Sequence, residues 1–172
     1  KKVEVSLYKN ANKIVVVTNN FYDYLINLDI SKEKIAIVPN GTYGNQSIEE
    51  NGAIDLKSKL GLKDKFVISY IGTHGMAHGL SFILNSITEL ERDIHFLFIG
   101  DGAQKKELIT LSNKLDLNNV TFLDSKPKSE IDSYIRISDA SLVNLIKSEV
   151  FHNVIPSKIF ENVNHQKPIL LG

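Results

Sequence analysis

The sequence predicts an α/β fold in which a parallel, Rossmann-like sheet carries helices on both faces. Three observations support it. Apolar runs of strand length recur along the chain, turn-forming residues follow most of them, and a stripe of helical periodicity follows each loop. Strand, loop and helix repeated in this order give parallel strands joined by helices. Ligands of such sheets bind outside the carboxyl ends of the strands, so the loops there are where chemistry is expected.

Composition narrows the classes of function. The 172 residues suffice for one good core and part of a second domain, and 42% of them are apolar, as in a soluble globular protein. The net charge is zero without basic clusters, so nucleic acid is not expected as a partner. Cysteine is absent, which excludes disulfides and thiolate metal sites. No apolar run approaches a membrane span in length, and no signal peptide opens the sequence.

The first part of the chain is expected to fold as helix, strand, helix and strand before a linker. The β-branched run from Lys13 to Thr18 predicts a buried strand, and Asn19 and Asn20 are expected caps of the next helix. Pro39-Asn-Gly41 is a strong turn signal. A polar stretch without pattern then marks the predicted internal boundary. In order, these elements are residues 3–11, 13–18, 21–28, 34–38 and the linker 42–52.

A regular alternation of helices and strands follows the linker. Gly61 is a good C-cap for the first of these helices, and the apolar stripe from Leu80 to Leu90 predicts the second. The predicted strands are residues 66–71, 94–99, 120–123, 140–145 and 168–171. The predicted helices are residues 54–60, 80–90, 104–115 and 128–137, followed by a last helix near Pro156.

The last helix is expected to begin at Pro156. Proline suits the first turn of a helix, where its missing N–H is no loss. Ile155, Ile159 and Val163 recur at i, i+4 and i+8, which predicts an apolar stripe packed on the sheet. Without an initiator Met, and with an end directly after an apolar run, the sequence is expected to be a fragment of a longer chain.

The same helix carries charged side chains on another face. Lys158, Glu161 and His165 recur at i, i+3 and i+7, so a cation, a carboxylate and an imidazole are expected together. The helix dipole favours anions at this end, and a phosphorylated ligand with ribose hydroxyls would suit such a face. The alternative is an exposed Lys–Glu pair without function.

The ligand edge is expected to consist of the loops after Ile71, Ile99, Leu123 and Leu145. In the first loop, Gly72, Gly75 and Gly79 would let backbone N–H groups approach a diphosphate closely. Ordinary packing of a tight turn is the alternative. Gly100-Asp-Gly102 lacks the third glycine of the dinucleotide fingerprint, and no P-loop motif is present.

The histidines do not predict a metal site. His74 and His78 are four residues apart, but no carboxylate lies between them as in H-E-x-x-H. His95 opens a strand and is expected to be structural. No G-x-S-x-G motif is present, so a hydrolase of that kind is not expected.

Together these residues resemble the carboxyl-terminal domain of retaining, nucleotide-sugar-dependent glycosyltransferases of the two-Rossmann (GT-B) architecture. Within it, the likeness is greatest to family four, often labelled group one, of bacterial capsule and O-antigen assembly. Pro156-Ser-Lys-Ile-Phe-Glu161 with Lys167-Pro168 is its most specific part. The other matching segments are residues 13–19, 34–41, 71–75, 98–102 and 120–123. The resemblance implies that residues 1–41 are the tail of the N-terminal domain and the crossover, and that residues 42–172 form a donor-nucleotide domain incomplete at its C-terminus.

The resemblance also implies roles for residues on the last helix. The family's E-x7-E motif uses its later glutamate to bind the ribose hydroxyls, and Glu161 matches it. The earlier position falls on Asn153, which departs from the motif, so His152, Asn153 and Val154 are implied to contact the donor sugar together.

Another departure concerns the diphosphate. The family's Arg–Lys pair after the first strand of this domain is absent, and Lys158 is the implied substitute, helped by the N–H groups of Gly72 and Gly75. The matching loop offers Thr73, His74 and His78 to the diphosphate. The residues implied near the base and ribose are Gly100, Asp101, Ser125 and Lys126.

The function implied by the resemblance is transfer of a sugar, with retention, from a nucleoside diphosphate sugar to a glycan or lipid-linked acceptor in cell-surface polysaccharide synthesis. A UDP-linked donor is expected, with an N-acetylated hexosamine as one candidate. Lys158 and Glu161 are the implied catalytic residues, and no metal or other cofactor is expected. The acceptor would bind the N-terminal domain, which lies mostly outside this sequence. The enzyme is expected in the cytoplasm or at the inner face of the plasma membrane. The fragment alone is expected to be inactive.

Two other classes of function remain open. A sugar-nucleotide epimerase of the same architecture would need carboxylates at the ligand edge, for which Asp101, Asp124, Glu149 and Glu161 are the candidates. A non-catalytic α/β interaction domain would carry Lys158 and Glu161 as a surface pair.

Overall fold

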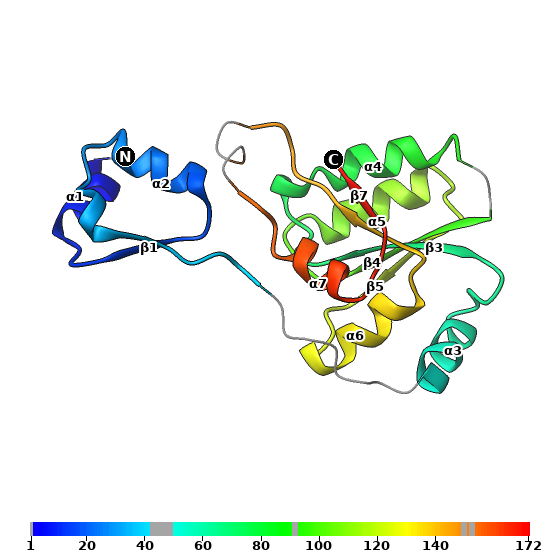
Figure 1. Cartoon of the computed structure of the whole chain (residues 1–172). Coiled ribbons are helices and arrows are strands. Elements are labelled where there is room, and N and C mark those ends of the chain that lie inside the picture. The colour runs from blue at the N-terminus through cyan, green and yellow to red at the C-terminus, as the bar shows by residue number, and fades with distance from the viewer. Residues whose placement is uncertain (1, 42–49, 91–92, 149–150, 152–153) are drawn as a thin grey trace. The chain divides into compact units, whose positions relative to one another are not determined.

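The computed structural model describes residues 2–41, 50–90, 93–148, 151 and 154–172, with side chains of residues 50–54 left out (Figure 1). The chain forms two compact units. The first comprises Lys1–Thr42 with Ser148–Ser157, and the second comprises Tyr43–Lys147 with Lys158–Gly172. Residues 148–157 therefore group with the first unit, which the sequence did not indicate.

In the described part of the first unit, the chain forms two parallel strands and two helices. They are α1 (Lys2–Asn10), β1 (Ile14–Val16), α2 (Asn19–Ile26) and β2 (Ile35–Ile37), with a 3-10 turn at Lys32–Lys34. The small core contains Val16, Leu25, Ile30 and Ile35. The cap of α2 is Thr18, whose side chain accepts a hydrogen bond from the Phe21 amide, and not Asn19 or Asn20 as expected. A threonine hydroxyl directly before the helix reaches this amide, which the expected cap residues, already helical, do not.

Within the ranges that the structure describes, the second unit is built on one parallel sheet of five strands. These are β3 (Phe66–Ile71), β4 (Ile94–Ile99), β5 (Val120–Leu123), β6 (Ala140–Val143) and β7 (Ile169–Leu171). Their order across the sheet is β5-β4-β3-β6-β7, and every neighbouring pair is parallel. The predicted α/β class is confirmed.

Helices cover both faces of this sheet, as predicted. They are α3 (Glu50–Lys59), α4 (Leu80–Ile87), α5 (Lys105–Lys114) and α6 (Lys128–Ile137). Alternate residues of β3 point to opposite faces: Ile68 and Tyr70 pack with α4 and α5, whereas Val67 packs with α6. In Figure 1, α4 and α5 lie on one side of the sheet and α3 and α6 on the other.

The last helix differs from its prediction. Helix α7 spans Lys158–Asn164, so it begins two residues after Pro156. The expected apolar stripe is wrong, because Ile155 and Val163 are 46% and 60% exposed. A polar contact attaches the helix instead: the buried Asn162 side chain bonds the Ser141 hydroxyl on β6 and the Lys158 carbonyl.

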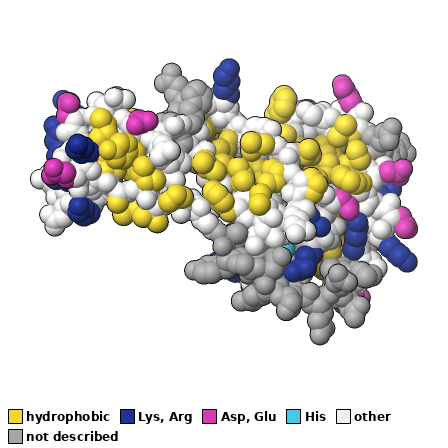
Figure 2. All heavy atoms as spheres, in the orientation of Figure 1, with side chains coloured by type: hydrophobic (Ala, Val, Ile, Leu, Met, Phe, Trp, Pro, Cys, Tyr) yellow, Lys and Arg dark blue, Asp and Glu magenta, His cyan; other side chains and the backbone are white. Residues whose placement is uncertain are grey.

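Apolar side chains also lie on the surface of the second unit. In Figure 2, hydrophobic side chains gather over the region of α4 and β7, where Phe82, Leu170 and Leu171 are exposed. Strand β7 is an edge of the sheet. Within the described ranges, no helix has the length and apolar character needed to cross a membrane.

Candidate functional site

The sheet has a topological switch point between β3 and β6. From β3 the chain proceeds outward through β4 and β5, and then returns to place β6 on the other side of β3. Loops that leave such neighbouring strands in opposite directions open a crevice at the carboxyl edge. Here the two loops are joined, because Asn144 donates to the His78 carbonyl over 2.7 Å and the Ile146 amide donates to the Ala77 carbonyl over 2.9 Å. The candidate site lies at this edge.

The loops after β3 and β4 pack backbone against backbone. The His74 amide donates to the Asp101 carbonyl over 2.8 Å, and the Gln104 amide donates to the His74 carbonyl over 2.9 Å. A Cβ on Gly100 would overlap the Gly72 carbonyl, and one on Gly102 would lie 2.5 Å from the His74 carbonyl oxygen. The two glycines of the Gly100-Asp-Gly102 segment therefore allow the loops to meet.

Gly72 does not have the predicted role. Its N–H donates to the Ile99 carbonyl over 2.9 Å and so is not offered to a ligand. The Gly79 amide is also used, in a bond of 3.3 Å to the Met76 carbonyl. The amides of Thr73 and Gly75, in contrast, make no hydrogen bond to another residue in the described ranges. They are the loop amides that a diphosphate could reach.

Lys158 occupies the space above Gly72. Its Nζ donates to the Tyr70 hydroxyl over 3.0 Å and lies 4.0 Å from the centroid of the Tyr70 ring. A Cβ on Gly72 would overlap this amine, so the glycine makes room for the lysine. Burial lowers the pKa of Lys158 to about 8, and the Glu161 charge opposes this shift. The amine is therefore mostly protonated at neutral pH.

Glu161 and His165, which were expected to lie together with Lys158, have different surroundings. Glu161 is exposed, and in the part of the chain that the structure describes its carboxylate makes no hydrogen bond or ion pair. His165 is directed elsewhere, since its Nε2 lies 3.0 Å from Asp132 Oδ1 on α6. The expected triple cluster is thus a pair, Lys158 and Glu161, because the α6 carboxylate holds the imidazole.

A pocket of about 230 Å³ lies at the ends of β3, β4 and β5, lined in part by Gly72, over which the Lys158 amine lies. It gathers six of the residues predicted to bind the donor, which are Gly72, Thr73, Gly100, Asp101, Ser125 and Lys126, together with Ile71, Ile99 and Ile131. Ser125 and Lys126 come from the loop after β5, and Lys126 Nζ lies 5.7 Å from the centroid of the Tyr134 ring.

Lys105 is a buried residue of the site that the sequence did not reveal. Its Nζ donates to the carbonyls of Gly100 and Leu123 over 2.8 and 3.1 Å, and to Asp124 Oδ1 over 2.6 Å. These bonds hold the ends of β4 and β5 together beneath the pocket, and the lysine keeps the pKa of Asp124 below its usual value. The available signal was a lysine in the first turn of the helix after a glycine pair.

His74 does not lie at the surface as expected. The imidazole is fully buried between the rings of Tyr70, Phe98 and Phe122, and neither ring nitrogen has a partner among the described residues. Burial is the main cause that lowers its pKa to about 4. The neutral imidazole therefore belongs to the core. His78 is partly exposed, with Nδ1 3.3 Å from the Asn144 carbonyl oxygen.

The buried His74 predicts acid sensitivity. Because its pKa is about 4 in the folded chain and ordinarily 6.5, the unfolded chain binds the proton more readily between these values. The contribution of His74 to the free energy of unfolding should be fully present above pH 6.5. The free energy of unfolding should fall by up to about 3 kcal/mol as the pH drops to 4. His74→Leu should flatten this part of the profile, measured by urea unfolding from pH 4 to 7. An unchanged slope in the variant would contradict the assignment.

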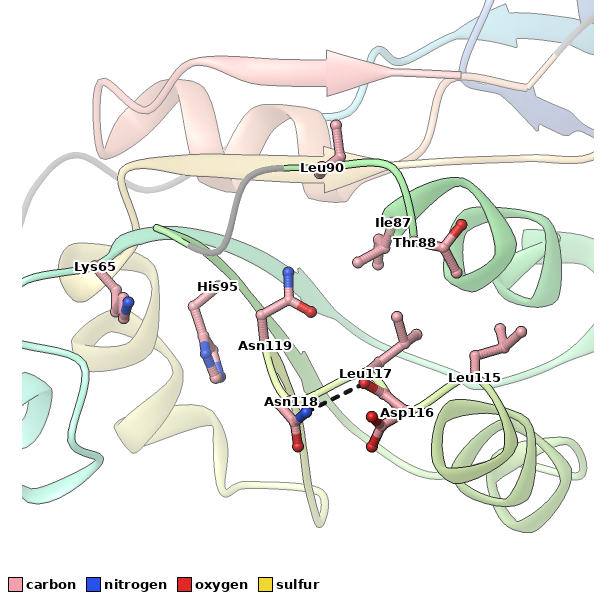
Figure 3. Close-up of a pocket in the computed structure, with 10 residues that line it drawn as sticks. All are labelled: Lys65, Ile87, Thr88, Leu90, His95, Leu115, Asp116, Leu117, Asn118 and Asn119. Atoms are coloured by element: carbon pink, nitrogen blue, oxygen red, sulfur yellow. Dashed lines mark hydrogen bonds between the residues drawn. The ribbon is translucent and has the colours of Figure 1, made fainter.

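A larger pocket, of about 370 Å³, lies at the opposite edge of the sheet (Figure 3). It is lined by residues at the amino ends of strands, such as Lys65, His95 and Asn119. His95 has the structural role expected of it, because its Nε2 lies 2.9 Å from Thr121 Oγ1 on β5. Six-residue strands separate the two edges by roughly 20 Å, so this pocket is not part of the glycine-loop site.

The sequence also predicts that three residues before α7 contact the donor sugar. His152 and Asn153 lie outside the described residues, and Val154 is exposed and belongs to the first unit. Within the described ranges, no group of three His, Asp or Glu side chains is placed to hold a metal ion.

Comparisons with known proteins identify relatives of this chain. A family model described as glycosyl transferases group 1 matches residues 53–169. The putative colanic acid biosynthesis glycosyl transferase WcaI of Escherichia coli is 22% identical over 154 residues, which are 87% of this chain and 38% of that protein. The N-acetylgalactosamine-N,N'-diacetylbacillosaminyl-diphospho-undecaprenol 4-alpha-N-acetylgalactosaminyltransferase of Campylobacter jejuni is 28% identical over 118 residues, 68% of this chain and 31% of that protein.

Solved structures share the fold. HepE of Anabaena, in complex with UDP-glucose, has a TM-score of 0.83 at 19% identity, over 99% of this chain and 47% of that one. WaaG, a glycosyltransferase involved in lipopolysaccharide biosynthesis, has a TM-score of 0.75 at 15% identity, over 92% of this chain and 44% of that one. The chain spans less than half the length of each of these relatives.

Proposed function

Because this chain belongs to the group 1 glycosyl transferases, we propose that its second unit is the C-terminal, donor-binding domain of a retaining GT-B enzyme and binds a UDP-sugar. One observation carries the proposal: the Lys158 amine lies over Gly72 at the switch point of the sheet, with the Glu161 carboxylate exposed one turn along α7. A cation and a carboxylate so placed suit a diphosphate and a ribose respectively.

Each part of a nucleoside diphosphate has a counterpart at this edge. The diphosphate accepts hydrogen bonds from Lys158 Nζ and from the amides of Thr73 and Gly75. The two ribose hydroxyls donate to Glu161. The base enters the pocket of about 230 Å³ beside Gly100 and Lys126, whose volume is of the right order for a pyrimidine with part of its sugar.

Charge stabilisation is the proposed contribution of this unit to the reaction. As the bond between the anomeric carbon and the diphosphate breaks, negative charge grows on the leaving oxygens. A protonated Lys158 and fixed amides lower the energy of that state without having to reorganise. We propose that no metal is required, with the positive charge coming from the lysine.

The acceptor and location are proposed by analogy with the relatives. The name of the Campylobacter jejuni relative describes transfer of N-acetylgalactosamine to an undecaprenol-linked glycan. We propose a glycan or lipid-linked acceptor in cell-surface polysaccharide synthesis, with an N-acetylated hexosamine as the leading sugar. The acceptor would bind residues of the N-terminal domain outside this chain. The proposed location of the enzyme is the cytoplasm or the inner face of the plasma membrane.

The first experiment is a titration of the chain with UDP, GDP and inorganic diphosphate, followed by amide NMR shifts. UDP should shift residues 72–79, 100–102 and 158–161. Glu161→Ala should weaken UDP binding by roughly 10-fold, because two hydrogen bonds to a charged group are lost, and should leave diphosphate binding unchanged. Glu89→Ala, which changes an exposed glutamate two residues beyond the end of α4, is the matched control.

The outcomes separate the candidate functions. UDP binding that Glu161→Ala does not alter would reject the ribose role. A chain that binds neither UDP, GDP nor diphosphate would favour an interaction domain. An epimerase would also bind UDP-sugar, but the whole enzyme would interconvert the sugar without an acceptor.

A further inference from the structure

We propose that Tyr70 is a positioning residue for the donor diphosphate, because its ring and its hydroxyl together hold the Lys158 amine in place. The inference rests on the proposed function and names a residue that no motif of the sequence marks. Tyr70 ends the buried part of β3 and is 1% exposed, so it touches Lys158 from below and does not itself face a ligand.

The hydroxyl of Tyr70 both donates and accepts a hydrogen bond. It donates its only proton to the Thr73 carbonyl over 2.7 Å, and its oxygen accepts from Lys158 Nζ over 3.0 Å. Burial raises the pKa of Tyr70 well above its usual value, so the hydroxyl stays neutral and keeps both roles. The amine therefore has one preferred place on the ring.

A tyrosine orients the lysine without neutralising it. A carboxylate partner would fix a lysine equally well, but it would cancel the charge that a diphosphate needs. Within the ranges that the structure describes, Lys158 forms no ion pair, and its Nζ lies 3.0 Å from the neutral Tyr70 hydroxyl and 4.0 Å from the centroid of the Tyr70 ring. Cation–π contact and a hydrogen bond to a hydroxyl hold the amine and leave its charge available to an anion.

The same side chain also shapes the loop. Because Tyr70 binds the Thr73 carbonyl, it fixes the peptide that precedes His74 and, with it, the direction of the neighbouring amides. One buried residue thus places the cation and the loop amides relative to each other. Among the described residues, Glu161 on α7 acts on Lys158, and the rings of His74 and His78 lie 5.9 and 5.8 Å from the Tyr70 ring, with Lys105 and Asp101 acting on His74.

The test compares Tyr70→Phe with the wild-type chain. Phenylalanine keeps the ring and removes the hydroxyl, so UDP and inorganic diphosphate should both bind about fivefold to twentyfold more weakly. In a Lys158→Met background the same change should have a clearly smaller effect, limited to the part that acts through the loop amides, whereas a general loss of stability would weaken binding equally in both backgrounds. Tyr24→Phe, in the first unit, is the matched control, and thermal unfolding checks that each variant is folded.

A second readout does not depend on any nucleotide. In the free chain, the Tyr70 ring should displace the Lys158 ε-methylene proton resonances upfield, and Lys158→Met identifies them. Tyr70→Leu should return these resonances to the ordinary lysine position, and Tyr70→Phe should retain part of the displacement. Undisplaced resonances in the wild-type chain would overturn the inference.

These arms distinguish two kinds of failure. If the wild-type chain binds neither UDP nor diphosphate while the lysine resonances are displaced, the proposed function fails and the contact between Tyr70 and Lys158 stands. If UDP binds and Tyr70→Phe binds it equally well, or weakens it equally in the Lys158→Met background, the positioning role is overturned and the proposed function stands.

Discussion

Replacing Lys158 by methionine should weaken UDP binding by roughly 10- to 100-fold, the largest effect on binding expected from a single change in this chain. Methionine keeps the straight side chain over Gly72 and the Tyr70 ring, but removes the charge. A charge-assisted hydrogen bond to a phosphate is thereby lost while the packing persists. Isothermal titration calorimetry with UDP measures the change, and Lys114→Met, an exposed lysine at the far end of α5, is the control.

The proposed role of Lys158 also predicts the direction in which UDP binding changes with pH. Only the protonated amine attracts the diphosphate. The affinity of the wild-type chain for UDP should therefore be highest below the lysine pKa of about 8 and should fall as the pH rises through this value. The bound anion favours the charged form and moves the midpoint upward. Lys158→Met should lack this alkaline decline. A variant that binds UDP as tightly as the wild type at pH 7 would remove Lys158 from the site.

Gly100→Ala should lower the free energy of unfolding by about 2–4 kcal/mol, the largest stability effect expected of one methyl group here. The added Cβ would overlap the Gly72 carbonyl, and the backbone of Gly100 has a φ of 145°, which an alanine rarely adopts. The Gly72 carbonyl belongs to the backbone and cannot move aside as the end of a flexible side chain could, so the loops after β3 and β4 must separate. Urea unfolding measures the loss.

Gly75→Ala provides the matched control for Gly100→Ala. Its Cβ would meet only Thr73 Cγ2, at an ordinary 3.7 Å, and its φ is −123°. The free energy of unfolding should change by less than about 1 kcal/mol. Equal losses in the two variants would show that the loops do not depend on the close approach at Gly100.

Much of the second unit could be predicted from the sequence because its central strands, β3, β4 and β6, are buried on both faces. The apolar runs at residues 94–99 and 120–123 and the helix at residues 128–137 have their predicted bounds. Burial of this kind is visible as an uninterrupted apolar run. Helix α7 was less predictable, because a hydrogen bond between Asn162 and Ser141, far apart in the sequence, anchors it in place of an apolar stripe.

The site could be predicted in its position but not in its details. Parallel topology fixes which loops meet, so the pocket residues from Gly72 to Lys126 were found together. Which groups face the ligand depends on contacts across the sheet. His74 turns into an aromatic core, and the buried amine of Lys105 bonds three oxygens from two strand ends. No spacing in the sequence encodes either contact.

The close approach of the loops after β3 and β4 has an evolutionary consequence. Main-chain atoms and two glycines make this contact, so the shape of the first loop does not depend on the side chains that it presents to solvent. Thr73 and Met76 are exposed and can be exchanged without rebuilding the sheet edge. The cation for an anionic ligand can therefore come from another element, such as Lys158 on α7 in the proposed donor site, while the backbone of the loop stays the same.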